Sequence, residues 1–432
     1  MAGRWLCFAS PWNRSPVVRL RLGQSSRWDT GKMPDKAYWQ KSRNTLCWFP
    51  SYAWQRVIRR SPHTGPVHLI IGLADHFEPS IVPHAPGTYA AQDEQERRVE
   101  RWCREYPGLV NDWRDGDGRV FRHTYFFPAE QYDKCLIDRL AEHCQAGWGE
   151  IEVHLHHGVE RPDTSENTRR SLIEFRDALV RHGCLSRMDG VGPPRYGFVH
   201  GNWALANSDG GRYCGVDDEM QVLAETGCYA DFTLPSAPSP AQIGKTNALY
   251  ECSLPLDCRA PHRRGRDLRS GLPPTIFPLI VQGPLLLSIA RRKRGWPFPY
   301  IENGALADHT PPTLRRLHLW CRAAITVQGR PDWIFIKLHC HGMDPRDHDA
   351  MLGAPMRQFL RQLTEAFGSA REDLHFVTMR EMVNMILAAC DGRSGNPGDF
   401  RDYRLRLISG VRHNGCASGA PTAAETPAPR AE

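Results

Sequence analysis

The sequence predicts an α/β fold, a single (β/α)7-8-type barrel that is nearly closed and carries flexible N- and C-terminal extensions. Three observations favour this fold. The chain has 432 residues, which suits one large α/β domain. Stretches typical of strands alternate with stretches typical of helices, and polar residues gather at the C-terminal ends of several strands. We place the barrel at residues 63–392, the N-terminal extension at 1–62 and the C-terminal tail at 393–432.

The first half of the predicted barrel alternates between apolar runs and helical patterns. The apolar runs predict strands at 65–77, 119–130, 150–157 and 195–203. Apolar residues near helical spacing predict helices at 130–145, 165–183 and 216–227. For the helix at 165–183, Ser165 fits the N-cap position and Gly183 fits the stop signal.

The second half continues this alternation. Strands are predicted at 228–235, 332–342 and 374–379, and helices at 311–329, 348–368 and 380–392. Repeated strand-then-helix units predict parallel strands that are covered by helices. About seven such units suit a closed or nearly closed barrel better than an open sheet.

Both ends of the chain differ in composition from the barrel. The first 32 residues contain five Arg and one acidic residue, a composition that resembles an organelle transit peptide. We favour the alternative that Met33 is the true start and that this leader is an artefact of the gene model. The segment from Ser409 to Glu432 is rich in Ala, Pro, Gly and Thr without periodicity, so we expect it to be disordered.

Composition also argues against several kinds of partner. The net charge of +7 comes largely from Arg at the ends and in loops. A nucleic-acid-binding protein usually gathers its basic residues in one patch, so we expect no nucleic-acid partner. The longest apolar run, 275–290, is interrupted by Pro278, Gly283 and Pro284, so it does not reach the ~20 residues of a membrane helix. The 14 cysteines include no CxxC pair and are typical of free thiols in a reducing compartment. We therefore expect a cytoplasmic protein without a membrane span.

Four predicted strands end in polar residues. These strand ends are "LADHFE" at 73–78, "HLHHG" at 154–158, "VHGNW" at 199–203 and "KLHCHG" at 337–342. In a barrel of parallel strands such ends meet at one mouth, where the chemistry of this fold class is found. A strand that is apolar along its length and polar only at its C-terminal tip is hard to explain by packing. The four ends therefore predict one shared site.

Histidines at these strand ends predict a metal site. In a strand alternate side chains share a face, so Glu152, His154 and His156 point into the mouth. His157 points outward unless the strand has already ended. Neutral imidazoles and carboxylates are ligands that Zn²⁺ and similar divalent ions prefer. We predict a divalent metal, with zinc preferred, that is held by His76, His154, His156 and His157.

The remaining polar residues of the strand ends predict catalytic roles. A bound metal would lower the pKa of a water molecule and polarise a substrate carbonyl. Asp75 is the predicted base, with Glu78 as an alternative. His339 or His341, across the mouth, is predicted to donate a proton to the leaving group.

Contacts with the substrate are predicted for Glu78, His200, Asn202 and Trp203. Trp203 would stack on a sugar ring. The alternatives are that Trp203 belongs to the core, that Asn202 forms a turn, and that Glu78, which precedes Pro79, is a solvated loop residue.

The order of these strand ends resembles the polysaccharide deacetylase (NodB-homology) superfamily, whose barrel is shared by several glycoside hydrolases. "LADHFEP" resembles the first motif of that family, with Asp75 in the position of the base and His76 in that of a metal ligand. "EVHLHHG" supplies His154 as the first histidine of the second motif. Gly158 stands where the family has its second histidine, so His156 or His157 would replace it.

Later segments extend the resemblance over roughly residues 66–390. "PPRYGFVHGNW" is similar to the third motif, and "IKLHCHG" is similar to the strand that bears the general acid, either His339 or His341. The resemblance implies a metal-dependent hydrolase that acts on carbohydrate, with removal of acetyl groups from a polysaccharide or oligosaccharide as the preferred reaction.

Two alternatives stay open. A glycosidase of the same barrel group needs two carboxylates ~5–9.5 Å apart, which Asp75 could form with Glu78 or with Glu152. A barrel without activity could instead bind glycan or act as a scaffold in polysaccharide assembly, because a fold does not determine a function.

Overall fold

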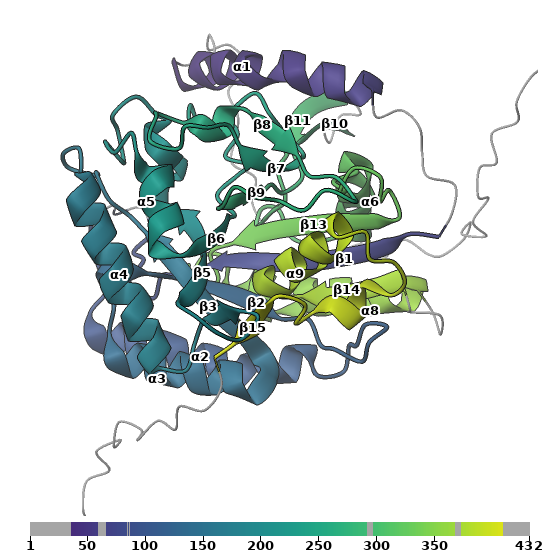
Figure 1. The fold of residues 1–432 in the computed structure, drawn as a ribbon. Coiled ribbons are helices and arrows are strands. Elements are labelled where there is room, and N and C mark those ends of the chain that lie inside the picture. The colour runs from purple at the N-terminus through teal and green to yellow at the C-terminus, as the bar shows by residue number, and fades with distance from the viewer. Residues whose placement is uncertain are drawn as a thin grey trace, which may run out of the picture. The chain divides into compact units, whose positions relative to one another are not determined.

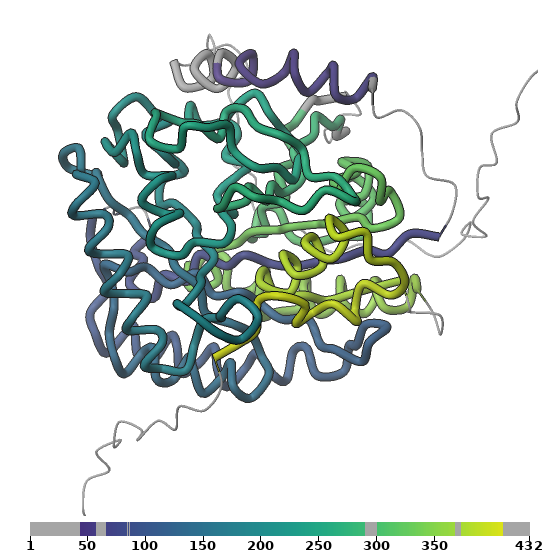
Figure 2. The backbone as a smooth tube through the Cα atoms, in the orientation of Figure 1, coloured from purple at the N-terminus to yellow at the C-terminus, as the bar shows by residue number. Residues whose placement is uncertain are grey.

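The computed structural model describes residues 36–58, 66–83, 85, 87–291, 297–367 and 373–408. Residues 1–40 and 41–432 form separate compact units, and in the first only the start of helix α1 (Lys36–Ile58) is described. The second unit is a mixed α/β fold with a mostly parallel central sheet (Figure 1). Figure 2 follows the backbone of its described residues, coloured by residue number. The predicted α/β class is thus confirmed.

The central sheet is built mainly from strands that precede a helix or a long loop. Its strands are β1 (His68–His76), β2 (His123–Pro128), β3 (Gly149–Leu155), β5 (Pro194–His200), β6 (Cys228–Asp231), β7 (Leu249–Cys252), β8 (Gly265–Asp267), β9 (Leu279–Val281), β12 (Ala305–Leu306) and β13 (Trp333–Cys340). They are arranged in the order β12–β13–β1–β2–β3–β5–β6–β9–β7–β8. From β12 to β9 the neighbouring strands are parallel, and β7 runs antiparallel to β9 and β8.

Further strands lie beside this path. β14 (Leu374–Val377) pairs with the first half of β1, whose second half pairs with β2. β4 (Ser186–Met188) joins β5 to β15 (Leu405–Leu407). β10 (Leu286–Arg291) and β11 (Pro297–Glu302) form a separate antiparallel ribbon. Hydrogen bonds between the described strands do not close the sheet into the predicted barrel.

The helices follow strands along the chain and pack beside the sheet. They are α2 (Gln92–Val110), α3 (Lys134–His143), α4 (Ser165–Arg181), α5 (Glu219–Thr226), α6 (Leu314–Ala323), α7 (His348–Leu352), α8 (Ala354–Phe367) and α9 (Met379–Cys390). Among the described residues, none of the helices combines the length and apolar character needed to cross a membrane.

The predicted N-cap of α4 is one residue off. Thr164, which has extended backbone angles, caps the helix by accepting a hydrogen bond from the backbone N–H of Asn167. Ser165 is instead the first helical residue, and its hydroxyl donates to Asp218. Gly183 follows the end of α4 with a φ of 72°, a left-handed conformation that glycine adopts without strain.

Both faces of the parallel strands are buried, and they face different sets of neighbours. On β1, Ile71 and Leu73 pack in one apolar cluster with Trp102 of α2. Ile70 and Ala74, on the opposite face, pack in a second cluster that includes residues of α9. A parallel strand that is buried on both faces has a nearly continuous apolar sequence, and β1 has such a sequence. The alternation also decides which polar side chains at the strand end can meet.

The predicted extensions are partly folded. Trp48 and Tyr52 of α1 pack with Ala237 and Leu285, so this part of the predicted extension at 1–62 belongs to the folded unit. The predicted tail at 393–432 begins too early, because Pro397–Phe400 forms a short 3-10 helix and β15 follows it. Residues 1–32 and 409–432 lie outside the described residues.

The buried Arg401 explains why the start of the predicted tail is folded. Its guanidinium lies 3.0 Å from Asp115, 2.6 Å from Asp117 and 3.1 Å from Glu381. A buried cation needs paired anions, and these carboxylates come from two other segments, the loop after α2 and the first turn of α9. The pairing therefore holds residues 397–408 against the sheet and α9.

Candidate metal centre

Three potential metal ligands, His76, Glu78 and His154, converge where β1 and β3 end. His76 is the last residue of β1, and His154 is the last but one of β3. Both strands run parallel to β2, which lies between them, so their C-terminal ends lie at one edge of the sheet. One potential ligand atom from each of the three residues lies within 4.8 Å of the others. The structure thus brings together two of the predicted ligands and a carboxylate.

The orientation of His154 leaves one ring nitrogen facing the carboxylate. Its Nδ1 lies 2.7 Å from the carbonyl oxygen of Val199. Because a carbonyl only accepts, Nδ1 carries the hydrogen and the lone pair is on Nε2. Nε2 is buried and makes no hydrogen bond, although Oε1 of Glu78 lies 3.3 Å away. Two facing acceptors without a donor between them are the arrangement that a cation would satisfy.

The charges of these groups also fit a divalent ion. Burial acts to raise the pKa of Glu78, but the neighbouring imidazoles of His154 and His156 lower it to about 2. Burial, assisted by His341 and His154, lowers the pKa of His76 well below its ordinary value. The centre therefore offers an ionised carboxylate at Glu78 and a neutral imidazole at His76, which are the forms that bind metals.

His156 lies at the rim of this centre and is held by a carboxylate that the sequence analysis did not include. Its Nδ1 lies 2.7 Å from Oε1 of Glu130, whose other oxygen accepts from the backbone N–H of His156 at 3.2 Å. Its Nε2 lies 3.8 Å from Oε1 of Glu78. His156 is only half-buried, so this nitrogen can meet a ligand from outside.

His339 and His341 come from β13 and the residues after it, on the other side of His76. The ring centre of His341 lies 4.7 Å from that of His76, and the ring centre of His339 lies 6.3 Å away. His339 is buried, its Nδ1 has no hydrogen-bond partner, and burial lowers its pKa well below the ordinary value. His341 is half-buried. Both predicted proton donors thus adjoin the candidate centre.

Asp75 does not face this centre, which corrects its predicted position. Its carboxylate is fully buried, with Oδ2 2.9 Å from Nδ1 of His123 and Oδ1 accepting from the backbone N–H of Gly342 at 2.7 Å. The reason is the alternation of β1, because Asp75 shares a face with Leu73 whereas His76 shares a face with Ala74. Asp75 therefore ties β1 to its neighbours.

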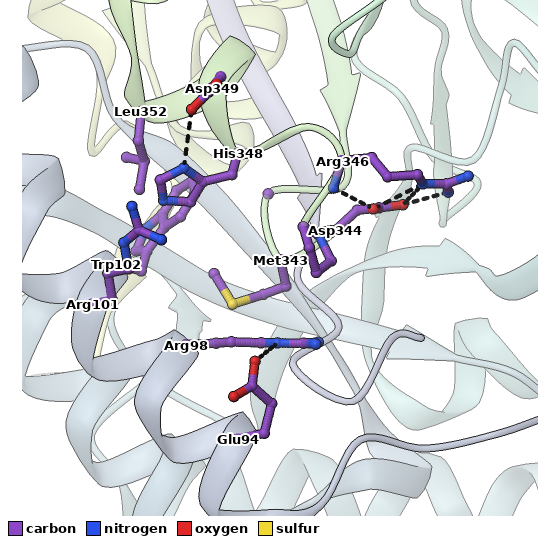
Figure 3. A pocket seen from close by; sticks show the side chains of 12 residues that line it. Glu94, Arg98, Arg101, Trp102, Met343, Asp344, Arg346, His348, Asp349 and Leu352 are labelled. Carbon is purple, nitrogen blue, oxygen red and sulfur yellow. Dashed lines mark hydrogen bonds and ion pairs between the residues drawn. The ribbon is translucent and has the colours of Figure 1, made fainter. Parts of the chain in front are cut away.

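A cavity of about 350 Å³ lies beside the loop that follows β13 (Figure 3). It is lined by side chains of α2, including Arg98 and Trp102, and by loop residues such as Met343 and Arg346. Arg98 pairs with Glu94 at 2.9 Å, and Arg346 pairs with a loop carboxylate. Gly342 and Trp102, which line the cavity, lie beside the carboxylate of Asp75, so the cavity is on the Asp75 side of β1 and its lining includes no imidazole of the candidate metal centre.

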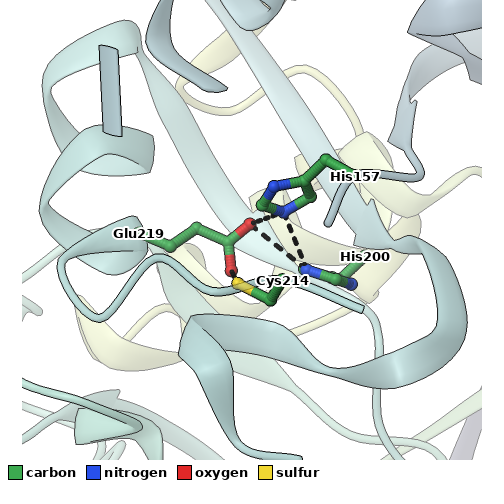
Figure 4. Close-up of side chains that lie close together, drawn as sticks. All are labelled: His157, His200, Cys214 and Glu219. Carbon is green, nitrogen blue, oxygen red and sulfur yellow. Dashed lines mark hydrogen bonds and ion pairs between the residues drawn. The ribbon is translucent and has the colours of Figure 1, made fainter. Parts of the chain in front are cut away.

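His157 and His200 lie together in a second cluster (Figure 4), which does not include His154. β3 ends at Leu155, yet His157 does not turn into the mouth with His154 and lies beside His200 instead. His200 lies on the face of β5 that carries Phe198, which packs among the helices. The prediction of His157 in the same metal set as His154 is therefore wrong in position, and His200 is buried rather than open to a substrate.

Asn202 and Trp203 occupy a short 3-10 turn at Gly201–Trp203, directly after β5. Both are half-buried and both have positive φ values, 57° and 61°. Asn202 thus forms a turn, in agreement with the alternative given for it. Contact of either residue with a substrate stays a prediction.

No protein-family model matches the chain, and no curated protein matches it significantly. The candidate metal centre therefore rests on the geometry of the chain's own residues.

Sequence reasoning missed Glu130, Cys214 and Glu219. Glu130 lies two residues after the end of β2, so the rule of polar residues at strand ends would have included it. Neither Cys214 nor Glu219 stands directly after a strand of the central sheet, and no local sequence pattern marks them as neighbours of a histidine. Their position depends on how the segment between β5 and α5 folds back.

Proposed function

We propose that this protein is a metal-dependent hydrolase that acts on carbohydrate, with removal of acetyl groups from a polysaccharide or oligosaccharide as the preferred reaction. The observation that carries the proposal is the convergence of His76, Glu78 and His154 at the C-terminal ends of parallel strands. Ligand sites of α/β folds lie at that edge. The carbohydrate substrate and a curved, nearly closed barrel come from the resemblance of the strand ends to the polysaccharide deacetylase superfamily.

His76, Glu78 and His154 would hold the ion, and zinc suits a set of two imidazoles and one carboxylate. Three protein ligands are typical of catalytic zinc sites, which keep a further position open. When bound, such an ion supplies Lewis-acid polarisation of a carbonyl and lowers the pKa of water. The unpartnered Nε2 of His154 is the feature of this chain that fits it best.

Proton transfer falls to the imidazoles beside the ligands in this proposal. Glu130 orients His156 through Nδ1, so Nε2 is the atom that accepts or donates a proton. On the far side of His76, the half-buried His341 is better placed than the buried His339 to meet a substrate. We therefore assign the base to His156 with Glu130, in place of Asp75, and the acid to His341.

The two-carboxylate glycosidase receives less support from the same geometry. Asp75 is engaged by His123 and Gly342, and Glu152 accepts from the hydroxyl of Tyr229 and the backbone N–H of Gly197, both at 2.6 Å. Carboxylates that are buried and bonded in this way do not flank a substrate. Their positions favour structural roles.

The test is release of acetate from acetylated chito-oligosaccharides and acetylated xylan by the zinc-loaded protein. We expect acetate from the wild type, loss of release in His154→Ala, and retention in His318→Ala, which removes an exposed imidazole on α6. Reducing sugar without acetate would indicate a glycosidase. Binding of the glycans with neither product would indicate the scaffold alternative, and both results overturn the proposal.

A further inference from the structure

Four side chains from separate segments meet in a buried cluster apart from the candidate metal centre. They are His157 after β3, His200 at the end of β5, Cys214 in the following loop and Glu219 at the start of α5 (Figure 4). One potential ligand atom of each lies within 4.8 Å of the others, and all four residues are buried.

The two histidines direct the same ring nitrogen to the middle of the cluster. Nδ1 of His157 lies 3.0 Å from Oδ2 of Asp163, and Nδ1 of His200 donates to the carbonyl oxygen of Gly201. Each Nδ1 therefore has its own hydrogen-bond partner outside the cluster. The two Nε2 atoms face each other at 3.0 Å. Metal-bound histidines show this pattern, in which an outer carboxylate or carbonyl holds the nitrogen that does not bind the metal.

The remaining distances fit a tetrahedral ion. Oε1 of Glu219 lies 2.9 Å from Nε2 of His157 and 3.4 Å from Nε2 of His200. Sγ of Cys214 lies 3.6 Å from Oε2 of the same carboxylate. Around a tetrahedral zinc with bonds of ~2.0–2.3 Å, neighbouring ligand atoms are separated by about 3.3–3.7 Å. The observed separations of 2.9–3.6 Å lie close to that range.

We propose that His157, His200, Cys214 and Glu219 bind a Zn²⁺ ion as a closed structural site, separate from the candidate metal centre. Thiolate, imidazole and carboxylate together suit zinc better than magnesium or calcium, which prefer oxygen ligands. Four protein ligands fill a tetrahedral ion, and their burial leaves no position for a substrate.

The ion would fasten a long irregular segment to the sheet. Between β5 and α5 the chain forms only short 3-10 turns, and several residues there other than glycine have positive φ values, among them Ala206 and Tyr213. Glu219 also accepts from the backbone N–H of Ala206 at 2.6 Å, and the carbonyl of Cys214 accepts from Asp163 at 2.8 Å. A zinc ion would connect the ends of β3 and β5 to this segment and to α5.

The short distances in the cluster have a competing explanation without a metal. A proton on Nε2 of His157 could be shared between Glu219 and His200. The two explanations differ at Cys214, since only the metal requires a thiolate ligand. The candidate metal centre contains no cysteine, but a third group that could hold an ion, Asp75, His123 and Cys340, does. A signal from a metal-bound sulfur therefore reports this cluster when it is lost in Cys214→Ser and retained in Cys340→Ser.

The experiment replaces zinc with Co²⁺ in the full chain and records the thiolate-to-cobalt charge-transfer band in the near ultraviolet. We expect the band in the wild type, its loss in Cys214→Ser together with one equivalent of metal, and its retention in His154→Ala. Cys228→Ser and Cys340→Ser are the matched controls at other buried free cysteines, and both should retain the band. A cobalt-loaded wild type without the band, or a band that persists in Cys214→Ser, would overturn the proposal.

A second measurement needs no substitution at Cys214, in case Cys214→Ser does not fold. X-ray absorption at the zinc edge of the wild type should show a sulfur neighbour at ~2.3 Å beside nitrogen and oxygen at ~2.0–2.1 Å. A zinc-loaded protein without a sulfur neighbour contradicts the site even if the proposed hydrolase is active. Conversely, a sulfur neighbour that persists in Cys340→Ser supports this site alone when the protein releases no acetate, and a sulfur neighbour that is lost in Cys340→Ser contradicts it.

Discussion

Nε2 of His154 lies 3.3 Å from Oε1 of Glu78, yet this buried nitrogen makes no hydrogen bond. The other ring nitrogen, Nδ1, donates to the carbonyl oxygen of Val199, so Nε2 directs its lone pair at the ionised carboxylate of Glu78. A cation between them would remove the repulsion of two acceptors. This relationship joins β3 to the loop after β1 and is the basis of the metal predictions.

Glu78→Gln should weaken zinc binding because it removes the charged ligand of the centre. Loss of an outer partner of a metal ligand costs about 10–100-fold in affinity, so loss of the ligand itself should cost more than this. Competition with a chromophoric chelator measures the change. Glu96→Gln, which removes an exposed glutamate of α2, should leave affinity unchanged. Equal affinity in Glu78→Gln and the wild type would exclude Glu78 as a ligand.

Glu130→Gln should lower kcat/KM for acetate release by about 10- to 100-fold while zinc stays bound. Glu130 contacts the imidazole of His156 and not the three ligands, so its loss leaves the metal in place but misorients the proposed base. Kinetics and metal analysis on the same preparation check both parts. A parallel loss of zinc would instead make His156 a ligand.

Asp75→Asn should destabilise the fold and leave the zinc content unchanged. The carboxylate holds His123 and the backbone of Gly342, and weakening such buried bonds costs about 1–3 kcal/mol. Urea unfolding gives the free energy, with Asp112→Asn as a control at an exposed position. If Asp75→Asn keeps wild-type stability but loses all acetate release, the original assignment of Asp75 as the base is restored.

Glu381 should make stability depend on pH in the acid range. Burial acts to raise its pKa, but the charges of Arg122 and Arg401 lower it to about 2. A pKa below the unfolded value of 4.5 means that the stabilisation is complete above pH 4.5 and is lost as the pH falls through about 2. The effect is on the order of 3 kcal/mol.

Urea unfolding at pH 6, 4 and 3 would measure this dependence. Glu381→Gln should flatten the acid part of the curve, and the exposed Glu96→Gln should reproduce the wild type. An unchanged curve in Glu381→Gln would show that the ion pairs with Arg122 and Arg401 do not set the pKa of this carboxyl.

The sequence by itself determined the α/β class and the edge at which polar side chains gather. Apolar runs with polar ends are visible residue by residue, and parallel strands bring such ends together, so His76 and His154 could be named as neighbours in advance. Only the tertiary structure decided the face and the partner of each side chain. Asp75 meets His123 and Gly342, and His157 meets His200 rather than His154 although β3 has ended before it. Cys214 lies beside His157 because the loop between β5 and α5 folds back. This fold depends on packing across the whole chain and not on local sequence.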